Sequence, residues 1–225
     1  KLQTEFFTAR RLNVIEDAAQ SFGASYQGIP SGKMGDISVL SFDPTKNLNN
    51  YGSGGMILTD DARIASNVRN ERNNGKESEH EFSGTNSKMN EADCAQMLVK
   101  LQYFDAWQER RTKIAEYYST ELLKFVNVPV ATPGAVHAWH KYVIRVKDRS
   151  KLQHHLSIAG IETKVHYNKT LFDYPVGMAY GPDPNTGAFW EATQLTKECL
   201  SLPIYPELTD EEVERVVEAV RDFYW

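Results

Sequence analysis

The sequence predicts an α/β fold, because short apolar runs typical of buried strands alternate with capped helices. The three expected strands are bounded by Gly, Asp or Pro and cover Asn13–Asp17, Ile37–Phe42 and Gly55–Asp60. Asp60 or Asp61 can cap a helix that runs to Arg72, and Asn90 can cap the next helix. The alternation predicts a sheet flanked by helices.

After Pro129 and Pro133 the pattern changes to smaller α+β units, which predicts a second domain. A long helix with one apolar side precedes this change and is expected to bridge the two lobes. We therefore expect domains at 1–105 and 106–225. Within the second domain the expected elements are strands His140–Val146 and Ile161–Val165, helices Ser150–Ala159 and Ala188–Lys197, a surface loop at 174–186, and a final helix opened by the capping box Thr209–Glu212. At the start of the chain, Lys1–Arg11 has apolar residues at helical spacing.

The composition is that of an ordinary globular protein of 225 residues, 41% hydrophobic and 24% charged, with a formal net charge of −5. Lys and Arg form no basic stripe, which argues against nucleic-acid binding, and no apolar run approaches the length of a membrane span. Cys94 and Cys199 lie far apart in no metal or redox spacing, so we expect reduced thiols and a cytoplasmic protein. No signal peptide is visible, although the chain begins at Lys1 rather than Met.

Lys46 is the first candidate functional residue, because it follows the carboxyl end of an expected strand. Pro44 has no N–H to give to a sheet and ends the strand Ile37–Phe42. In open α/β sheets, ligands bind beyond the carboxyl ends of strands. The alternative is a solvated loop lysine, which is the common fate of this residue type.

Four motifs in this order resemble the DegT/DnrJ/EryC1/StrS family of pyridoxal-phosphate-dependent sugar aminotransferases, which have the aspartate aminotransferase fold. The motifs are Val14–Gln20 (Val-Ile-Glu-Asp-Ala-Ala-Gln), Ser41–Asn47 (Ser-Phe-Asp-Pro-Thr-Lys-Asn), Gly52–Gly55 (Gly-Ser-Gly-Gly) and Gly84–Met89 (Gly-Thr-Asn-Ser-Lys-Met). The resemblance extends from near Arg10 to the C-terminus. It implies that the chain holds the C-terminal part of the large cofactor-binding domain, a mixed sheet flanked by helices, and a smaller α+β domain.

The resemblance implies a role for each polar residue of these motifs. Lys46 would condense with the cofactor aldehyde and later move protons, and Asp17 would keep the pyridine nitrogen protonated. Gln20 would hydrogen-bond the phenolic oxygen and Ser41 the phosphate. Asn86 would reach the phosphate of a neighbouring subunit, so that a homodimer shares its active sites. Each residue also has a structural alternative, such as a cap, a turn or a backbone hydrogen bond.

Further residues bear on the substrate. His166 and Tyr167 resemble the family's His-Tyr pair near the entrance for the sugar nucleotide, and Lys88 stands where the family usually has Arg. His137 and His140 lie in a segment that resembles the family's strand at the start of the small lobe. As metal ligands they are poor candidates, because a separation of three places them on opposite faces of a strand and no third ligand is placed.

The expected activity is amino transfer, with glutamate as the amino donor, to a keto-sugar nucleotide. Related sugar dehydratases have histidine at the position of Lys46, so lysine favours transfer over dehydration. Family members have a further N-terminal half before Asp17, with phosphate-binding and ring-stacking residues. If nothing supplies that half, we expect weak cofactor binding. The alternative function is then an impaired, dimerising or regulatory partner.

Overall fold

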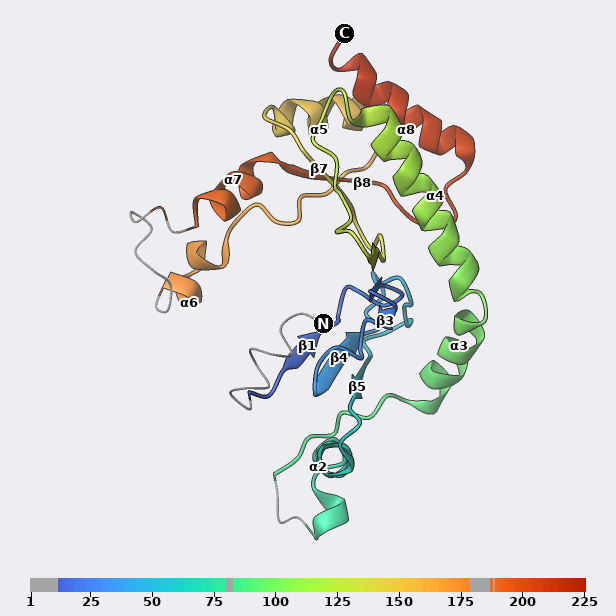
Figure 1. The fold of residues 1–225 in the computed structure, drawn as a ribbon, viewed down its shortest axis with the longest axis vertical. Coiled ribbons are helices and arrows are strands. Elements are labelled where there is room, and N and C mark those ends of the chain that lie inside the picture. The colour runs from blue at the N-terminus through green and yellow to red at the C-terminus, as the bar shows by residue number, and fades with distance from the viewer. Residues whose placement is uncertain (1–11, 80–82, 179–186, 188) are drawn as a thin grey trace. The chain divides into compact units, whose positions relative to one another are not determined.

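A computed structural model describes residues 12–79, 83–178, 187 and 189–225 (Figure 1). The chain divides into two compact units, one made of Lys1–Glu109 and Ala131–His140, the other of Arg110–Val130 and Lys141–Trp225. The boundary between Glu109 and Arg110 falls inside helix α4, Phe104–Leu122. The expected apolar helix at Lys1–Arg11 lies outside the described residues. The division into domains at residue 105 stays a prediction, because the two units are defined only by how compactly their residues pack.

The first unit contains a mixed sheet of the strands β1 (Ile15–Asp17), β4 (Ile37–Ser41) and β5 (Gly55–Leu58), in the order β1-β4-β5 (Figure 1). Strand β1 is parallel to β4, whereas β5 is antiparallel to it. All three strands were expected, and they confirm the α/β class. A hairpin of β2 (Ser25–Tyr26) and β3 (Ile29–Pro30), which pairs with β6 (Ala135–Val136), lies in a region where no strand was expected.

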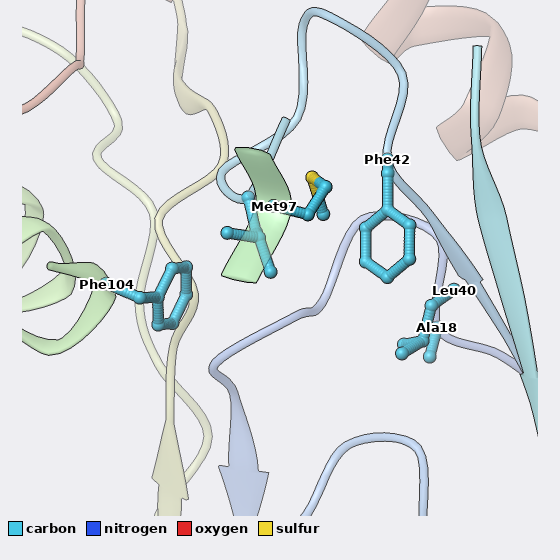
Figure 2. Close-up of a cluster of buried hydrophobic side chains, with 6 residues drawn as sticks. Ala18, Leu40, Phe42, Met97 and Phe104 are labelled. Carbon is cyan, nitrogen blue, oxygen red and sulfur yellow. The ribbon is translucent and has the colours of Figure 1, made fainter. Parts of the chain in front are cut away.

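The two faces of this sheet differ in burial. Along β4, Ser38 and Leu40 are buried, while Ile37, Val39 and Ser41 are half-buried. The period of two places alternate residues on opposite faces. The buried face packs on a core of Ala18, Leu40, Phe42, Leu48, Met97 and Phe104 (Figure 2). We call the other face, with Ile15, Asp17, Val39, Ser41 and Ile57, the open face of the sheet.

Two capped helices follow the sheet in the first unit. Helix α2 (Ala62–Glu71) begins at Asp61, whose carboxylate accepts from two backbone N–H groups, and helix α3 (Glu91–Leu101) begins at Asn90, as the sequence predicted. A short 3-10 helix, η1 (Lys76–Ser78), lies between them. Met97 is the buried residue of α3, whereas its other apolar residues are exposed: Ala92, Ala95, Leu98, Val99 and Leu101.

The second unit is built around the antiparallel pair β7 (Tyr142–Arg145) and β8 (Cys199–Leu202). Helices α5 (Arg149–Ile158), α7 (Trp190–Glu198) and α8 (Asp210–Asp222) accompany this pair, with the short helices η2 (Leu171–Asp173) and α6 (Pro175–Met178) (Figure 1). Its buried side chains include Ile114, Tyr118, Leu122, Tyr142, Ile144, Leu152, Leu156, Leu200, Val217 and Val220. Thr209 and Glu212 form the predicted capping box of α8.

Three expectations for the second unit were wrong or incomplete. Residues 161–165 form no strand, because Lys164 makes only an isolated bridge to Ser201. The strand that pairs with β7 is β8, a segment that periodicity did not single out. The segment at 174–186 begins with helix α6, and 179–186 lies outside the described residues. Among the residues that the structure describes, no helix is long and apolar enough to cross a membrane.

Candidate active site

Asp17 and Ser41 lie at the same end of two neighbouring parallel strands. Asp17 is the last residue of β1 and is in register with Val39 of β4, and Ser41 ends β4 two positions later. Because the side-chain period of a strand is two, Asp17, Val39 and Ser41 share the open face. The Asp17 side chain is exposed, and its Oδ1 accepts from the N–H of Ala19 at 3.1 Å. The structure therefore brings these two predicted residues to one edge of one face.

Lys46 lies in the loop that leaves the same end of β4. The loop opens with a tight turn in which the Lys46 N–H donates to the Asp43 carbonyl at 2.9 Å, and it closes where Asn50 N donates to the Phe42 carbonyl at 2.9 Å. The Asp43 carboxylate accepts from the N–H and the hydroxyl of Thr45 at 2.9 and 2.7 Å. These bonds to Thr45 lower the pKa of Asp43, and the electrostatic effects of the nearby Lys46 and His140 lower it further. The loop thus places Lys46 and His140 within electrostatic reach of one carboxylate.

The far side of this loop is held by side chains of helix α3. Lys100 Nζ donates to the carbonyl and the Oδ1 of Asn49 at 2.9 and 2.7 Å, and Gln96 Nε2 donates to Asn50 Oδ1. Asn50 is buried. The exposed helix α3 therefore contributes polar anchors for the Lys46 loop as well as one core residue.

Asn47, the residue after Lys46, joins the loop to the segment 138–140 of the same unit. Its Nδ2 donates to the Ala138 carbonyl at 2.6 Å, and its Oδ1 lies 3.2 Å from His140 Nδ1. Asn47 is only 8% exposed, so both polar atoms of its amide are satisfied inside the protein. Sequence reasoning treated Asn47 as part of a motif and assigned it no role. The sequence signal that could have identified Asn47 was its position directly after Lys46.

Glu16 supports the strand that carries Asp17. Its carboxylate accepts from the hydroxyls of Ser31 and Ser38 at 3.0 and 2.9 Å and from the N–H groups of Gly32 and Met34 at 2.8 and 2.9 Å. Gly32 has a φ of +95°, which favours glycine. Burial raises the pKa of Glu16, but the four hydrogen bonds outweigh it and the pKa is lowered. Sequence reasoning missed this role, because the four donors lie in other segments.

The other residues predicted for the first unit are exposed. Gln20 lies in the turn that follows β1, where Ser21 N donates to the Ala18 carbonyl at 3.2 Å. Asn86 forms an isolated bridge with Asn73, and Lys88 lies beyond it in the segment that leads to α3. The roles of these residues stay predictions.

His166 and Tyr167 belong to the second unit. His166 Nδ1 lies 2.8 Å from the Ser201 hydroxyl, and Tyr167 is exposed. Burial lowers the pKa of His166, and the nearby charges of Lys141 and Lys164 lower it further, which favours the neutral imidazole. Their part in substrate binding stays a prediction.

The end of β1 and β4 suits a cofactor that has a basic ring nitrogen, an anionic group and an aldehyde. A carboxylate, a hydroxyl and an amine, from Asp17, Ser41 and Lys46, leave this one end of the sheet, and the two strand residues share the open face. These are the side chains that pyridoxal phosphate requires for its ring nitrogen, its phosphate and its aldehyde. Among the described residues, no group of three His, Cys, Asp or Glu side chains could hold a metal ion.

The fold is α/β, and the candidate residues lie at the carboxyl ends of parallel strands, which is where ligands bind in open α/β sheets. The DegT/DnrJ/EryC1/StrS aminotransferase family matches residues 5–221, and the chain belongs to this family.

Relatives of known name support this membership. The chain is 41% identical over 219 residues to the "pleiotropic regulatory protein" of Geobacillus stearothermophilus, covering 95% of this chain and 58% of that protein. It is 36% identical over 217 residues to the dTDP-3-amino-3,4,6-trideoxy-alpha-D-glucose transaminase of Streptomyces venezuelae, covering 94% and 56%. The chain thus spans less than three fifths of the length of these relatives.

Solved structures have the same fold. S. venezuelae DesV, solved in complex with a ketimine intermediate, matches with a TM-score of 0.92 and 34% identity, over 97% of this chain and 60% of that one. A DegT/DnrJ/EryC1/StrS aminotransferase from Brucella abortus matches with a TM-score of 0.92 and 31% identity, over 98% and 59%.

Proposed function

We propose that the chain is the C-terminal part of a pyridoxal-phosphate-dependent aminotransferase that transfers an amino group from glutamate to a keto-sugar nucleotide. The observation that carries the proposal is the arrival of Asp17, Ser41 and Lys46 at one end of a parallel strand pair, in a member of this family. The names of relatives as dTDP-sugar and UDP-sugar aminotransferases support the substrate class. The proposed organisation is a partial large domain followed by a smaller α+β domain.

Each side chain at this edge would have a separate task. Bound pyridoxal phosphate supplies an aldehyde and an electron-withdrawing ring. The Asp17 carboxylate would hold a proton at the ring nitrogen, because an opposite charge favours the protonated form. Ser41 would donate its hydroxyl proton to a phosphate oxygen, and Gln20 would hydrogen-bond the phenolic oxygen. Lys46 Nζ would attach the cofactor and afterwards accept and return the proton that moves at the substrate carbon.

Covalent trapping tests this assignment on the 225-residue chain itself. Pyridoxal phosphate and borohydride are added to the purified protein, and the modified peptide is identified by mass spectrometry. We expect modification at Lys46, loss of that adduct in Lys46→Ala, and weaker modification in Asp17→Asn. Lys33→Ala, which removes an exposed lysine of the same unit, is the matched control and should leave the adduct intact. Modification spread evenly over surface lysines would contradict the proposal.

A homodimer is part of the proposal. Helix α3 exposes Leu98, Val99 and Leu101, with Leu98 66% exposed, and apolar surface of this kind favours a protein partner. Asn86 and Lys88 lie in the segment before this helix and would reach the phosphate and substrate of the second copy. We expect Leu98→Glu to shift the sedimentation equilibrium toward monomer, whereas Ile158→Glu, at an equally exposed site on α5, should leave it unchanged. A monomeric wild-type chain would contradict this part.

A second candidate function is that of a catalytically impaired regulatory partner. One observation favours it, since a relative 41% identical to the chain carries the name of a regulatory protein. The trapping experiment separates the two, because a regulatory partner without cofactor chemistry would give no selective adduct at Lys46. Dehydration is disfavoured by the lysine itself.

His166 and Tyr167 would contact the sugar nucleotide, so His166→Ala should weaken its binding in a calorimetric titration without removing the Lys46 adduct.

A further inference from the structure

The amide of Asn47 has only one orientation that satisfies both of its contacts. A backbone carbonyl can only accept, so the atom 2.6 Å from the Ala138 oxygen must be the donating Nδ2. The other end of the amide, Oδ1, then faces His140 Nδ1 at 3.2 Å. Oδ1 can only accept, and therefore Nδ1 of His140 must carry the hydrogen. The Ala138 carbonyl thus selects the Nδ1–H tautomer of His140 through Asn47.

This pairing matters because Asn47 follows Lys46 directly. The Lys46 loop is otherwise held by its own turn at Asp43 and by side chains of helix α3. Asn47 adds an anchor to a segment about ninety positions later in the chain, the last segment of the first unit before the chain enters the second unit at Lys141. Gln108 also holds the segment 137–140, because its Nε2 donates to the His137 carbonyl at 3.0 Å.

We propose that Asn47 is a positioning residue for Lys46, and that it acts by clamping the Lys46 loop to Ala138 and to the Nδ1–H tautomer of His140. The inference deepens the proposed function, because it names what holds the candidate catalytic amine in place. Asn47 itself is buried and bonded on both sides, so it acts through the backbone that it shares with Lys46. His140 acts as the hydrogen donor that completes the clamp.

Two measurements on the full chain test the clamp without relying on the cofactor. The first is long-range proton–nitrogen NMR of the imidazoles, which reports the tautomer of His140. The second is reductive methylation with formaldehyde, followed by peptide mass spectrometry, which reports how freely the Lys46 amine meets solvent. Exposed Lys33 in the same sample is the internal reference.

In wild type we expect a protonated Nδ1 on His140 and slower methylation of Lys46 than of Lys33. In Asn47→Ala the tautomer should revert toward the Nε2–H form that predominates in free histidine. Methylation of Lys46 should rise about fivefold or more, because the variant loses two hydrogen bonds and losing even one increases the population of an open loop about fivefold. Asn49→Ala is the matched control, because Asn49 is an amide in the same loop that bonds the Pro44 carbonyl and Lys100 and not the segment 138–140. It should leave the His140 tautomer unchanged, because the contact between Asn47 and His140 stays in place.

A second pair of variants covers the case in which Asn47→Ala does not fold. His140→Gln keeps an N–H donor for Asn47 Oδ1 and should retain the slow methylation of Lys46, whereas His140→Ala should lose it. The proposal is overturned if the variants that remove the contact methylate Lys46 at the wild-type rate, or if His140→Gln behaves as His140→Ala does. A failure of the proposed function gives a different result: pyridoxal phosphate would not be trapped on Lys46, although the tautomer and methylation measurements still showed the clamp.

Discussion

Strands β4 and β8 show how differently the two units use a sheet. Residues of β4 alternate between buried and half-buried positions, whereas all four residues of β8 are buried. Both faces of β8, in the second unit, are therefore covered. The first unit covers one face and leaves Ile15 and Ile57, 72% and 45% exposed, on the open face beside Asp17. The first unit therefore presents the candidate residues Asp17 and Ser41 on the face of the sheet that does not pack on its core.

The largest expected effect comes from the core of the second unit. Leu200 is fully buried in β8, so Leu200→Ala should lower the free energy of unfolding by about 2–5 kcal/mol. Ile57→Ala, on the open face of the first unit, should cost less than about 1 kcal/mol, because its side chain is already half in water. Urea unfolding followed by circular dichroism measures both. Equal costs would mean that the open face is covered in solution and would break the comparison.

A smaller effect is expected at Glu16, the polar support of strand β1. Glu16→Gln replaces two accepting oxygens by one acceptor and one donor, which leaves part of the Ser31, Gly32, Met34 and Ser38 donors unmatched. The variant should lose about 1–3 kcal/mol of unfolding free energy at pH 7. Ser38→Ala removes one donor and leaves the carboxylate with three, and should therefore cost less.

The stability difference between wild type and Glu16→Gln should depend on pH with a definite sign. The folded pKa of Glu16 lies below the ordinary value of 4.5, so its contribution to stability is complete above 4.5 and is lost as the pH falls through the folded pKa. The difference in unfolding free energy between wild type and Glu16→Gln should accordingly shrink below pH 4.5. A difference that stays constant down to pH 3 would show that the carboxylate charge is not what Glu16 contributes.

The smallest effects are expected at the helix caps. Thr209 caps α8, a helix with five buried residues, and Thr209→Ala should cost about 1 kcal/mol. Asn90 caps α3, whose buried residue is Met97, and Asn90→Ala should cost about 0.5 kcal/mol, because fraying of α3 uncovers little apolar surface. Thr209→Ser and Asn90→Asp keep the accepting oxygens and should be nearly neutral. Thermal unfolding measures the four variants, and the reverse order would contradict the contrast between the units.

Local signals in the sequence predicted the elements that carry the candidate site. β-branched runs ending at Asp17 and Ser41, Pro44 after the second run, and the caps Asp61 and Asn90 are all encoded within a few residues. The β2–β3 hairpin was missed because its strands are two residues long and give no periodicity. Strand β8 was missed for a related reason, since four buried residues in succession do not alternate.

The sequence by itself determined the fold class, the strand ends at which Asp17 and Ser41 stand, and the loop that bears Lys46, because each depends on the covalent and steric preferences of neighbouring residues. Only the tertiary structure decided that Asn47 meets Ala138 and His140, and that α3 leaves Leu98 in solvent. These contacts join segments far apart along the chain, and their free energy exists only once both segments have been brought together.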